Sequence, residues 1–221
     1  MVRQLNTPGR DALTDGLRVV SFGGGTGLGR TLASLRDLGD RLTGIVATTD
    51  DGGSTGWLRE QSGGIAWGDV RNCLNQLSHQ PTLGSLLLEY RFSDVGELSG
   101  HSLGNLILLA LDQISPRPLH AIDLVRELVH VEARLMPMAE QPTRLHALDS
   151  EGVAVHGEVK VDALSLPPEK LWLEPSVSAT PEAVNAILEA DLITMGPGSF
   201  VTSVLPSLLV DGLREALLAS K

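Results

Sequence analysis

Apolar and polar positions along the chain form blocks that predict short buried strands separated by helices. Residues 17–22 and 42–48 are short apolar runs, typical of strands that are buried on both faces of a parallel sheet. Residues 28–38 between them carry leucines at helical spacing, and Gly39 is the expected end of that helix. The chain therefore opens with a βαβ unit, whose ligand crevice should lie at the carboxyl ends of the strands.

The later blocks predict a helical insertion followed by a small hairpin. Residues 49–56 form a polar loop, and helical patterns then recur with no strong strand between them, which predicts an insertion over about 69–130. The remaining expected elements are a hairpin over 143–147 and 153–161, a strand over 171–173, a helix over 181–190, a buried strand over 191–195 and a helix over 206–219. The predicted fold class is α/β, with a mostly parallel sheet flanked by helices, a helical insertion and a small β-hairpin.

Length and composition indicate one domain. The chain has 221 residues, 42% of them hydrophobic, and we expect a flexible leader over 1–15 and a single domain over 16–221. No segment has the apolar core of a signal peptide or the length to span a bilayer. The single cysteine, Cys73, suits a reducing compartment, so the expected location is the cytoplasm.

Charge narrows the expected partners. The chain has 17 Lys and Arg against 27 Asp and Glu, a formal net charge of -10, which argues against binding nucleic acid or an anionic membrane. A nucleotide can still bind, because backbone N–H groups and helix dipoles do not appear in the net charge. The expected partner is therefore a small-molecule nucleotide ligand, and the possibility of a homodimer stays open.

Glycine-rich turns follow two of the predicted strands. The first turn, Gly23–Gly29, runs into a helix, where backbone N–H groups can hold a phosphate; its central residues are Gly24, Gly25, Thr26 and Gly27. It has neither the lysine of a Walker A motif nor the dinucleotide fingerprint, so a purely structural turn is the alternative. The second turn contains Gly196, Gly198 and Ser199. Two such turns in one crevice could hold a diphosphate from both sides.

An acidic pair follows the second predicted strand. Asp50 and Asp51 precede two glycines and Ser54, at the edge where open α/β sheets bind ligands. The carboxylates could bind a ribose hydroxyl, a divalent ion or a substrate amine. Neighbouring residues in an extended segment point to opposite faces, so we expect only one to reach the ligand. An acidic turn in solvent is the structural alternative.

Two further clusters carry polar side chains near helix starts. Asp69 is the expected N-cap of a helix, and Arg71 and Asn72 then lie in its first turn, where a cation opposes the helix dipole and suggests a nearby anion. His101 and Asn105 are four residues apart and suit recognition of a base or sugar, although a structural histidine is equally compatible. The other histidines show no metal-ligand spacing; they are His79, His120, His130, His146 and His156.

The motifs taken together carry a resemblance to a known family. They are, in order, Gly23–Leu28, Asp50–Gly56, Gly68–Leu74, Tyr90–Phe92, Gly100–Leu106 and Gly196–Ser199. From Val19 onward the chain resembles the gluconeogenesis factor family (YvcK-like), within the superfamily of CofD-like 2-phospho-L-lactate transferases. Two departures stand out: Trp57 replaces an expected basic residue, and relatives continue beyond Lys221, which favours a truncated chain.

The resemblance implies a Rossmann-like core and assigns roles to the motifs. The regulatory branch is associated with UDP-sugars, gluconeogenic growth and cell shape, whereas the transferase branch moves a phospholactyl group from a guanosine diphosphate donor with a divalent metal. By resemblance, Gly24, Gly25, Thr26 and Gly27 match the nucleotide-phosphate loop, Gly196, Gly198 and Ser199 the second phosphate turn, and Asp50 and Asp51 the motif near the metal or substrate.

Three functions follow as hypotheses. In the first, the chain is a UDP-sugar-binding regulatory protein of carbon metabolism and cell morphogenesis, and His101 and Asn105 help to read the base. In the second, it is a phosphoryl-group transferase in which Asp50 and Asp51 are catalytic and hold Mg²⁺. In the third, it is a scaffold that acts through its helical insertion. No base or nucleophile stands out beyond the aspartate pair, so the sequence leaves open whether the chain is an enzyme.

Overall fold

The computed structural model describes residues 16–78, 81–94 and 96–221. The expected leader, 1–15, and His79 lie outside the described residues. Within the described part of the chain, no helix is long and apolar enough to cross a membrane.

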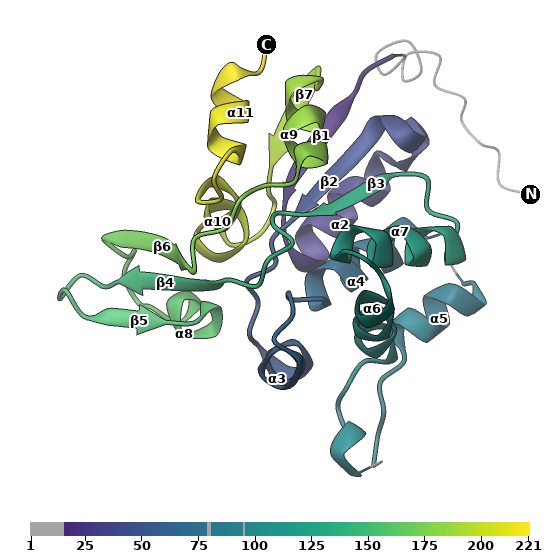
Figure 1. Cartoon of the computed structure of the whole chain (residues 1–221), viewed down its shortest axis with the longest axis horizontal. Helices are drawn as coiled ribbons and strands as arrows, with labels where there is room; N and C mark the ends of the chain where they lie inside the picture. Colours follow the sequence, from purple (N-terminus) through teal and green to yellow (C-terminus); the bar gives the residue numbers. More distant parts are fainter. Residues whose placement is uncertain (1–15, 79–80, 95) are drawn as a thin grey trace, which may run out of the picture.

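A four-stranded parallel sheet forms the centre of the structure (Figure 1). β1 (Val19–Gly23) lies between β2 (Leu42–Val46) and β7 (Leu192–Met195), and β3 (Arg134–Pro137) pairs with the outer side of β2. The prediction of a mostly parallel sheet flanked by helices is confirmed. β3 was not predicted, because only its last three residues are buried and Pro137 ends it. β7 was expected to be a buried strand, but Leu192 and Met195 are about half exposed because β7 is an edge strand of the described sheet.

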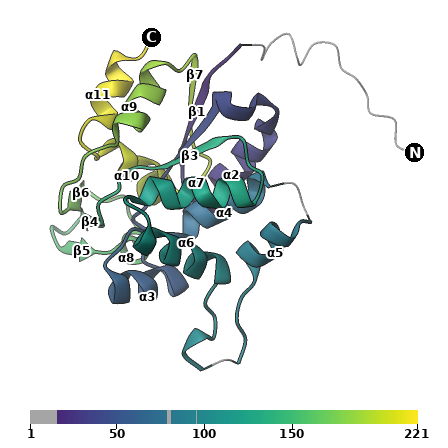
Figure 2. The same cartoon turned by 45° about the vertical axis from the view of Figure 1, so that its right-hand side comes forward.

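The two faces of this sheet bury separate apolar cores. On one face, β1 and β2 pack with α2 (Gly25–Ser34), α4 (Gly68–Leu77), α6 (Leu103–Ile114) and α7 (Pro118–Leu128). On the other face lie α9 (Pro181–Leu188) and α11 (Leu213–Ala219) together with a second sheet. Figure 2 shows the central strands between these two groups of helices. Both faces are covered, which explains the unbroken burial of β1 and β2.

The second sheet is antiparallel and contains the predicted hairpin. β4 (Arg144–Leu148) pairs with β5 (Ala154–His156) on one side and β6 (Lys170–Glu174) on the other. The expected second strand, 153–161, is wrong in its latter half, because Gly157 turns the chain and α8 (Glu158–Asp162) follows. This sheet lies at the opposite end of the molecule from α5 (Leu83–Glu89) in both views (Figures 1 and 2).

Several helix boundaries differ from the predicted ones. The first helix begins three residues early, at Gly25 inside the glycine turn, and ends at Ser34, before a 3-10 turn over Arg36–Arg41. The polar loop over 49–56 is shorter than expected, because α3 (Gly53–Ser62) begins within it. The expected last helix is split into α10 (Leu205–Leu208) and α11 around Gly212, and a π-helical turn over Phe200–Val204 precedes it. A short 3-10 turn over Gly96–Leu98 lies between α5 and α6.

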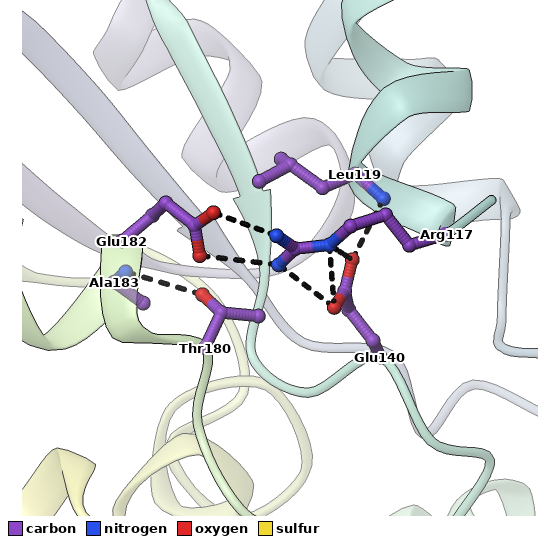
Figure 3. A network of polar contacts seen from close by, with 6 residues as sticks. All are labelled: Arg117, Leu119, Glu140, Thr180, Glu182 and Ala183. Atoms are coloured by element: carbon purple, nitrogen blue, oxygen red, sulfur yellow. Dashed lines mark hydrogen bonds and ion pairs between the residues drawn. The ribbon is translucent and has the colours of Figure 1, made fainter. Parts of the chain in front are cut away.

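An arginine connects elements from both faces of the parallel sheet (Figure 3). The Arg117 guanidinium donates to both carboxylate oxygens of Glu140, at 2.9 and 3.0 Å, and to both of Glu182, at 2.7 and 3.1 Å. Glu140 follows β3, and Glu182 lies in the first turn of α9, whose N-cap Thr180 accepts a bond from the Ala183 N–H at 3.1 Å. The start of α7 is thereby joined to the start of α9.

Candidate functional site

A cavity of about 250 Å³ opens at the carboxyl ends of β1 and β2. Five segments that are distant in sequence form its walls. Its lining residues are Gly24, Gly25 and Thr26 at the start of α2, Ala47, Thr49 and Asp50 after β2, Asp69 of α4, Glu158 of α8, and Thr202 and Ser203 of the π-helical turn. This is the edge where open parallel sheets place their ligands.

The glycines at the start of α2 allow a carboxylate to approach the backbone closely. A Cβ on Gly24 would lie 2.4 Å from Asp69 Oδ2, and one on Gly25 would lie 3.0 Å from Asp69 Oδ1. Gly25 has a φ of 51°, in the left-handed region. Its N–H donates a hydrogen bond to the Asp69 carboxylate, so a negative group already lies at the positive end of α2.

Asp69 faces the cavity and is not the N-cap of its helix. Trp67 occupies the N-cap position of α4, and Asp69 lies in the first turn. Burial, with the charges of Asp50 and Glu158 acting in the same direction, raises the pKa of Asp69 to about 7 against the opposing effects of the Gly25 N–H and Arg71. Such a carboxyl group can hold or release a proton near neutral pH.

The two adjacent aspartates have different roles. Asp50 lines the cavity, and its Oδ1 accepts a bond from the Gly52 N–H at 3.0 Å. Asp51 instead accepts bonds from the Glu158 N–H at 3.2 Å and the Val159 N–H at 3.0 Å, at the start of α8. Asp51 therefore orients the segment that carries Glu158.

Glu158 is a cavity residue that the sequence analysis missed. Burial, with the charges of Asp50, Asp162 and Asp51 acting in the same direction, raises the pKa of Glu158 to about 7, and a hydrogen bond with the Thr202 side chain opposes this rise. The sequence signal was Gly157, which has a φ of 100° and ends β5. Reading 153–161 as one strand concealed that Glu158 begins a helix.

Arg59 is a second residue that was missed, and it holds the acidic loop in place. This buried guanidinium donates from Nη1 to the carbonyls of Thr49 and Asp50, both at 3.0 Å, and from Nη2 to the carbonyl of Thr143. Burial lowers the pKa of Arg59, with Arg144 adding to this and the Asp51 and Asp50 charges opposing it. The loop after β2 is therefore fixed between α3 and the start of β4.

The second glycine turn contacts the first. A Cβ on Gly27 would lie 2.4 Å from the Pro197 carbonyl oxygen, so the turn after β7 lies directly against α2. Gly196 and Gly198 both have positive φ, at 86° and 144°. Ser199 caps the following turn by accepting from the Thr202 N–H at 3.3 Å. The cavity is lined by Thr202 and Ser203 of the π-helical turn that follows, and not by the predicted Gly196, Gly198 and Ser199.

The remaining predicted residues form a polar network beside the cavity. The buried Arg71 donates from Nε to Asn105 Oδ1 at 3.0 Å and from Nη2 to Asn72 Oδ1 at 2.6 Å. Burial lowers the pKa of Arg71, with the Arg91 charge in the same direction. Its described hydrogen-bond acceptors are uncharged, which leaves a buried positive charge two residues along α4 from Asp69.

The same network reaches α3 through Ser54. Ser54 Oγ lies 3.0 Å from His101 Nδ1 and 3.5 Å from Asn105 Nδ2. The Trp57 ring packs on His101 with centroids 4.6 Å apart, so the residue that replaces the expected cation contacts the histidine instead. His101 and Asn105 are buried and join α3 to α6, and they do not line the cavity.

Comparisons with known proteins agree with this architecture. The family described as 2-phospho-L-lactate transferase CofD matches residues 19–221. A Yersinia pestis protein provisionally named gluconeogenesis factor is 58% identical over 205 residues, which cover 93% of this chain and 67% of that protein. A Listeria innocua protein named gluconeogenesis factor is 42% identical and covers 92% of this chain and 64% of its own length.

A solved structure is similar as well. The crystal structure of a Bacillus halodurans protein of the UPF0052 family has a TM-score of 0.87 and 38% identity, covering 93% of this chain and 66% of that chain. The chain thus spans about two thirds of the length of these relatives.

Proposed function

The chain belongs to the CofD family and to its gluconeogenesis factors, and from that premise we propose that it binds a nucleotide sugar of the UDP-sugar class in the cavity at the carboxyl ends of β1 and β2. In this proposal it acts as a regulatory protein that links carbon metabolism to cell morphogenesis. The observation that carries the proposal is the contact of the two glycine turns, at Gly27 and Pro197, beside this cavity. A helix N-terminus with a glycine-rich turn suits a diphosphate.

The charges of the cavity require a cation for this ligand. Asp50, Asp69 and Glu158 line it, and no Lys, Arg or His is among its lining residues within the described chain. A diphosphate at this place would be repelled by the ionised carboxylates. Mg²⁺ would neutralise both sets of charges, because it binds through one or two carboxylates together with substrate phosphates and waters.

The residues present fit such an ion. Within the described part of the chain, no three His, Cys, Asp or Glu side chains are grouped closely enough to form a metal site made of protein alone. Asp50 and Asp69 both line the cavity, and the charge of Asp50 contributes to the raised pKa of Asp69. These two residues would hold Mg²⁺, with ligand phosphate and water completing its coordination, and Asp51 would act by holding α8.

Calorimetry with and without Mg²⁺ tests this proposal. UDP-N-acetylglucosamine, UDP-glucose and GDP are titrated into the chain and into the longer form that its relatives have. We expect the uridine compounds to bind with Mg²⁺ and at least about tenfold more weakly without it, a difference of about 1.4 kcal/mol. A failure of both forms to bind either uridine compound would overturn the proposal.

A pair of variants tests the role of the carboxylate charge. Asp69→Asn keeps the shape and removes the charge, so nucleotide affinity should lose most of its dependence on Mg²⁺. Asp37→Asn, on the exposed 3-10 turn after α2, is the matched control and should keep that dependence. Equal Mg²⁺ dependence in both variants would contradict the assignment of Asp69.

A transferase is the alternative, and the two carboxyl groups with raised pKa values favour it. Asp69 and Glu158 both have a pKa of about 7, near the optimum for general acid or base catalysis at neutral pH. Turnover of a guanosine diphosphate donor carrying a phospholactyl group, lost in Asp50→Asn, would support this function. Absence of turnover with donor, deazaflavin acceptor and Mg²⁺ would exclude it.

A further inference from the structure

Two histidine side chains converge on the antiparallel sheet, outside the cavity. His146 of β4 and His156 of β5 are register partners, and their Nδ1 atoms lie 2.5 Å apart. Directly opposed residues of an antiparallel pair lie on the same face with close Cβ atoms, so the backbone itself brings both rings together. The face opposite the histidines packs Leu145 and Ala147 into the core.

One of the two rings is fixed and the other is accessible. His146 is only 8% exposed, and the Trp172 ring of β6 stacks on it with centroids 5.6 Å apart and an interplanar angle of 18°. His156 meets His146 edge-on and is exposed to solvent. Lys170 Nζ lies 5.9 Å from the centre of the Trp172 ring. An ion could therefore reach the pair from solvent, and His156 could move to receive it.

Burial and neighbouring charges both act on His146. Burial lowers the pKa of His146, the His156 and Arg144 charges act in the same direction, and Glu174 opposes them. Of two facing Nδ1 atoms, one carries a proton and the other accepts it. A metal ion can replace that shared proton, because neutral imidazole is the ligand form.

We propose that His146 and His156 bind a divalent transition-metal ion of the Zn²⁺, Ni²⁺ and Cu²⁺ class through their Nδ1 atoms. Imidazole nitrogen suits these ions, whereas Mg²⁺ prefers oxygen. Zinc–nitrogen bonds of about 2.0–2.1 Å in tetrahedral geometry place the two nitrogens about 3.3 Å apart. The exposed His156 needs to move by about 0.8 Å to reach that separation. The described residues offer no group of three protein ligands, so water completes the coordination.

Calorimetric titration of the full chain with Zn²⁺, in excess Mg²⁺ to occupy carboxylates, tests this site. We expect binding that weakens at least about tenfold in His156→Asn and at pH 5.5, where protons compete for imidazole. His130→Asn is the matched control: His130 is exposed on a different element with a φ of 55°, which Asn tolerates. Loss of binding in His156→Asn with retention in His130→Asn supports the proposal. Absence of Zn²⁺ binding, or equal affinity in both variants, overturns it.

Fluorescence quenching by Cu²⁺ locates the ion independently. Trp172 stacks on a proposed ligand, whereas Trp57 packs on His101 and Trp67 is buried in the other core. Cu²⁺ should quench tryptophan emission in the native chain and lose most of that effect in Trp172→Phe. Quenching that persists unchanged in Trp172→Phe places the ion elsewhere and overturns the assignment. Thermal unfolding of each variant confirms that it is folded.

Discussion

At the scale of single residues, the effect of replacing a glycine depends on the atoms that an added side chain would contact. Gly27 lies within α2 with ordinary helical geometry, so alanine there would be favoured by helix propensity by about 1 kcal/mol. A Cβ would however lie 2.4 Å from the Pro197 carbonyl oxygen, which is backbone and cannot rotate away. The contact between the two turns therefore decides the outcome.

We expect Gly27→Ala to lower the free energy of unfolding by about 1–3 kcal/mol, because overpacking displaces the turn after β7. Urea denaturation measures this change, and nucleotide affinity should fall with it. Gly64→Ala is the control, since a Cβ there would meet its nearest atom at 3.5 Å. Equal stability of the two variants would mean that the turns do not support one another.

Residue-level chemistry could be predicted only where sequence neighbours carry it. The glycine turn and Asp50 follow strands directly, so their place at the sheet edge was visible in the sequence. The sequence did not show that the Asp69 side chain faces the cavity. Its partner Gly25 is 44 positions earlier, and only the packing of α2 on α4 brings the two residues together. His146 and His156 are similar, since a hairpin, not helical spacing, brings them together.

At the scale of secondary-structure elements, the ion pairs of one arginine join helices on opposite faces of the parallel sheet. Arg117 bonds Glu140 and Glu182, and Glu140 also accepts from the Leu119 N–H at 2.9 Å (Figure 3). The three charged side chains are 15–35% exposed, so water screens them less than it screens a surface pair. Hydrogen bonding to Arg117 is the main cause that lowers the pKa of Glu182.

We expect Arg117→Met to destabilise the chain by about 1–3 kcal/mol, because two carboxylates lose their charged donor. Arg18→Met is the control: Arg18 and Glu189 are 57% and 63% exposed, and such pairs contribute about 0–1 kcal/mol. Chemical denaturation of both variants measures the difference. Since the pKa of Glu182 is lowered in the folded state, the contribution of Glu182 to stability is present above about pH 4.5. It is lost as the pH falls through the lowered pKa. A loss no larger than that of Arg18→Met would contradict this role.

Elements were predicted well where one pattern dominated and poorly where packing overrode it. β1, β2 and α9 have continuous apolar runs or a clear cap, and their bounds were nearly right. α3 was missed because Gly52, Gly53 and Gly56 disguise its start, and the bonds of buried Arg59 fix it in the fold. β3 has only four residues, too few for a clear strand pattern in the sequence, and its parallel pairing with β2 defines it as a strand.

The charge distribution of the whole molecule makes its stability depend on the cavity. The chain carries a formal net charge of -10, and three of its carboxyl groups line one cavity. Two of them, Asp69 and Glu158, have pKa values raised to about 7, from 3.8 and 4.5. Ionising them in place opposes the folded state, so a cation that enters the cavity stabilises the molecule by binding only that state.

The sign of this effect gives a test on the entire chain. Between about pH 4 and pH 7 the folded state binds more protons at these groups than the unfolded state does, so their contribution to stability falls as pH rises and is flat above pH 7. Asp69→Asn cannot ionise, and we expect it to exceed the native chain in unfolding free energy by about 1–3 kcal/mol at pH 8, with a smaller gain at pH 5.5. Urea denaturation at both pH values measures the difference, and Asp37→Asn should show no such gain.

Mg²⁺ at pH 8 should stabilise the native chain more than Asp69→Asn, because only the native chain has the charge at residue 69 that the ion neutralises. If the unfolding free energy of Asp69→Asn exceeded that of the native chain equally at pH 5.5 and pH 8, packing and not charge would explain the difference in stability.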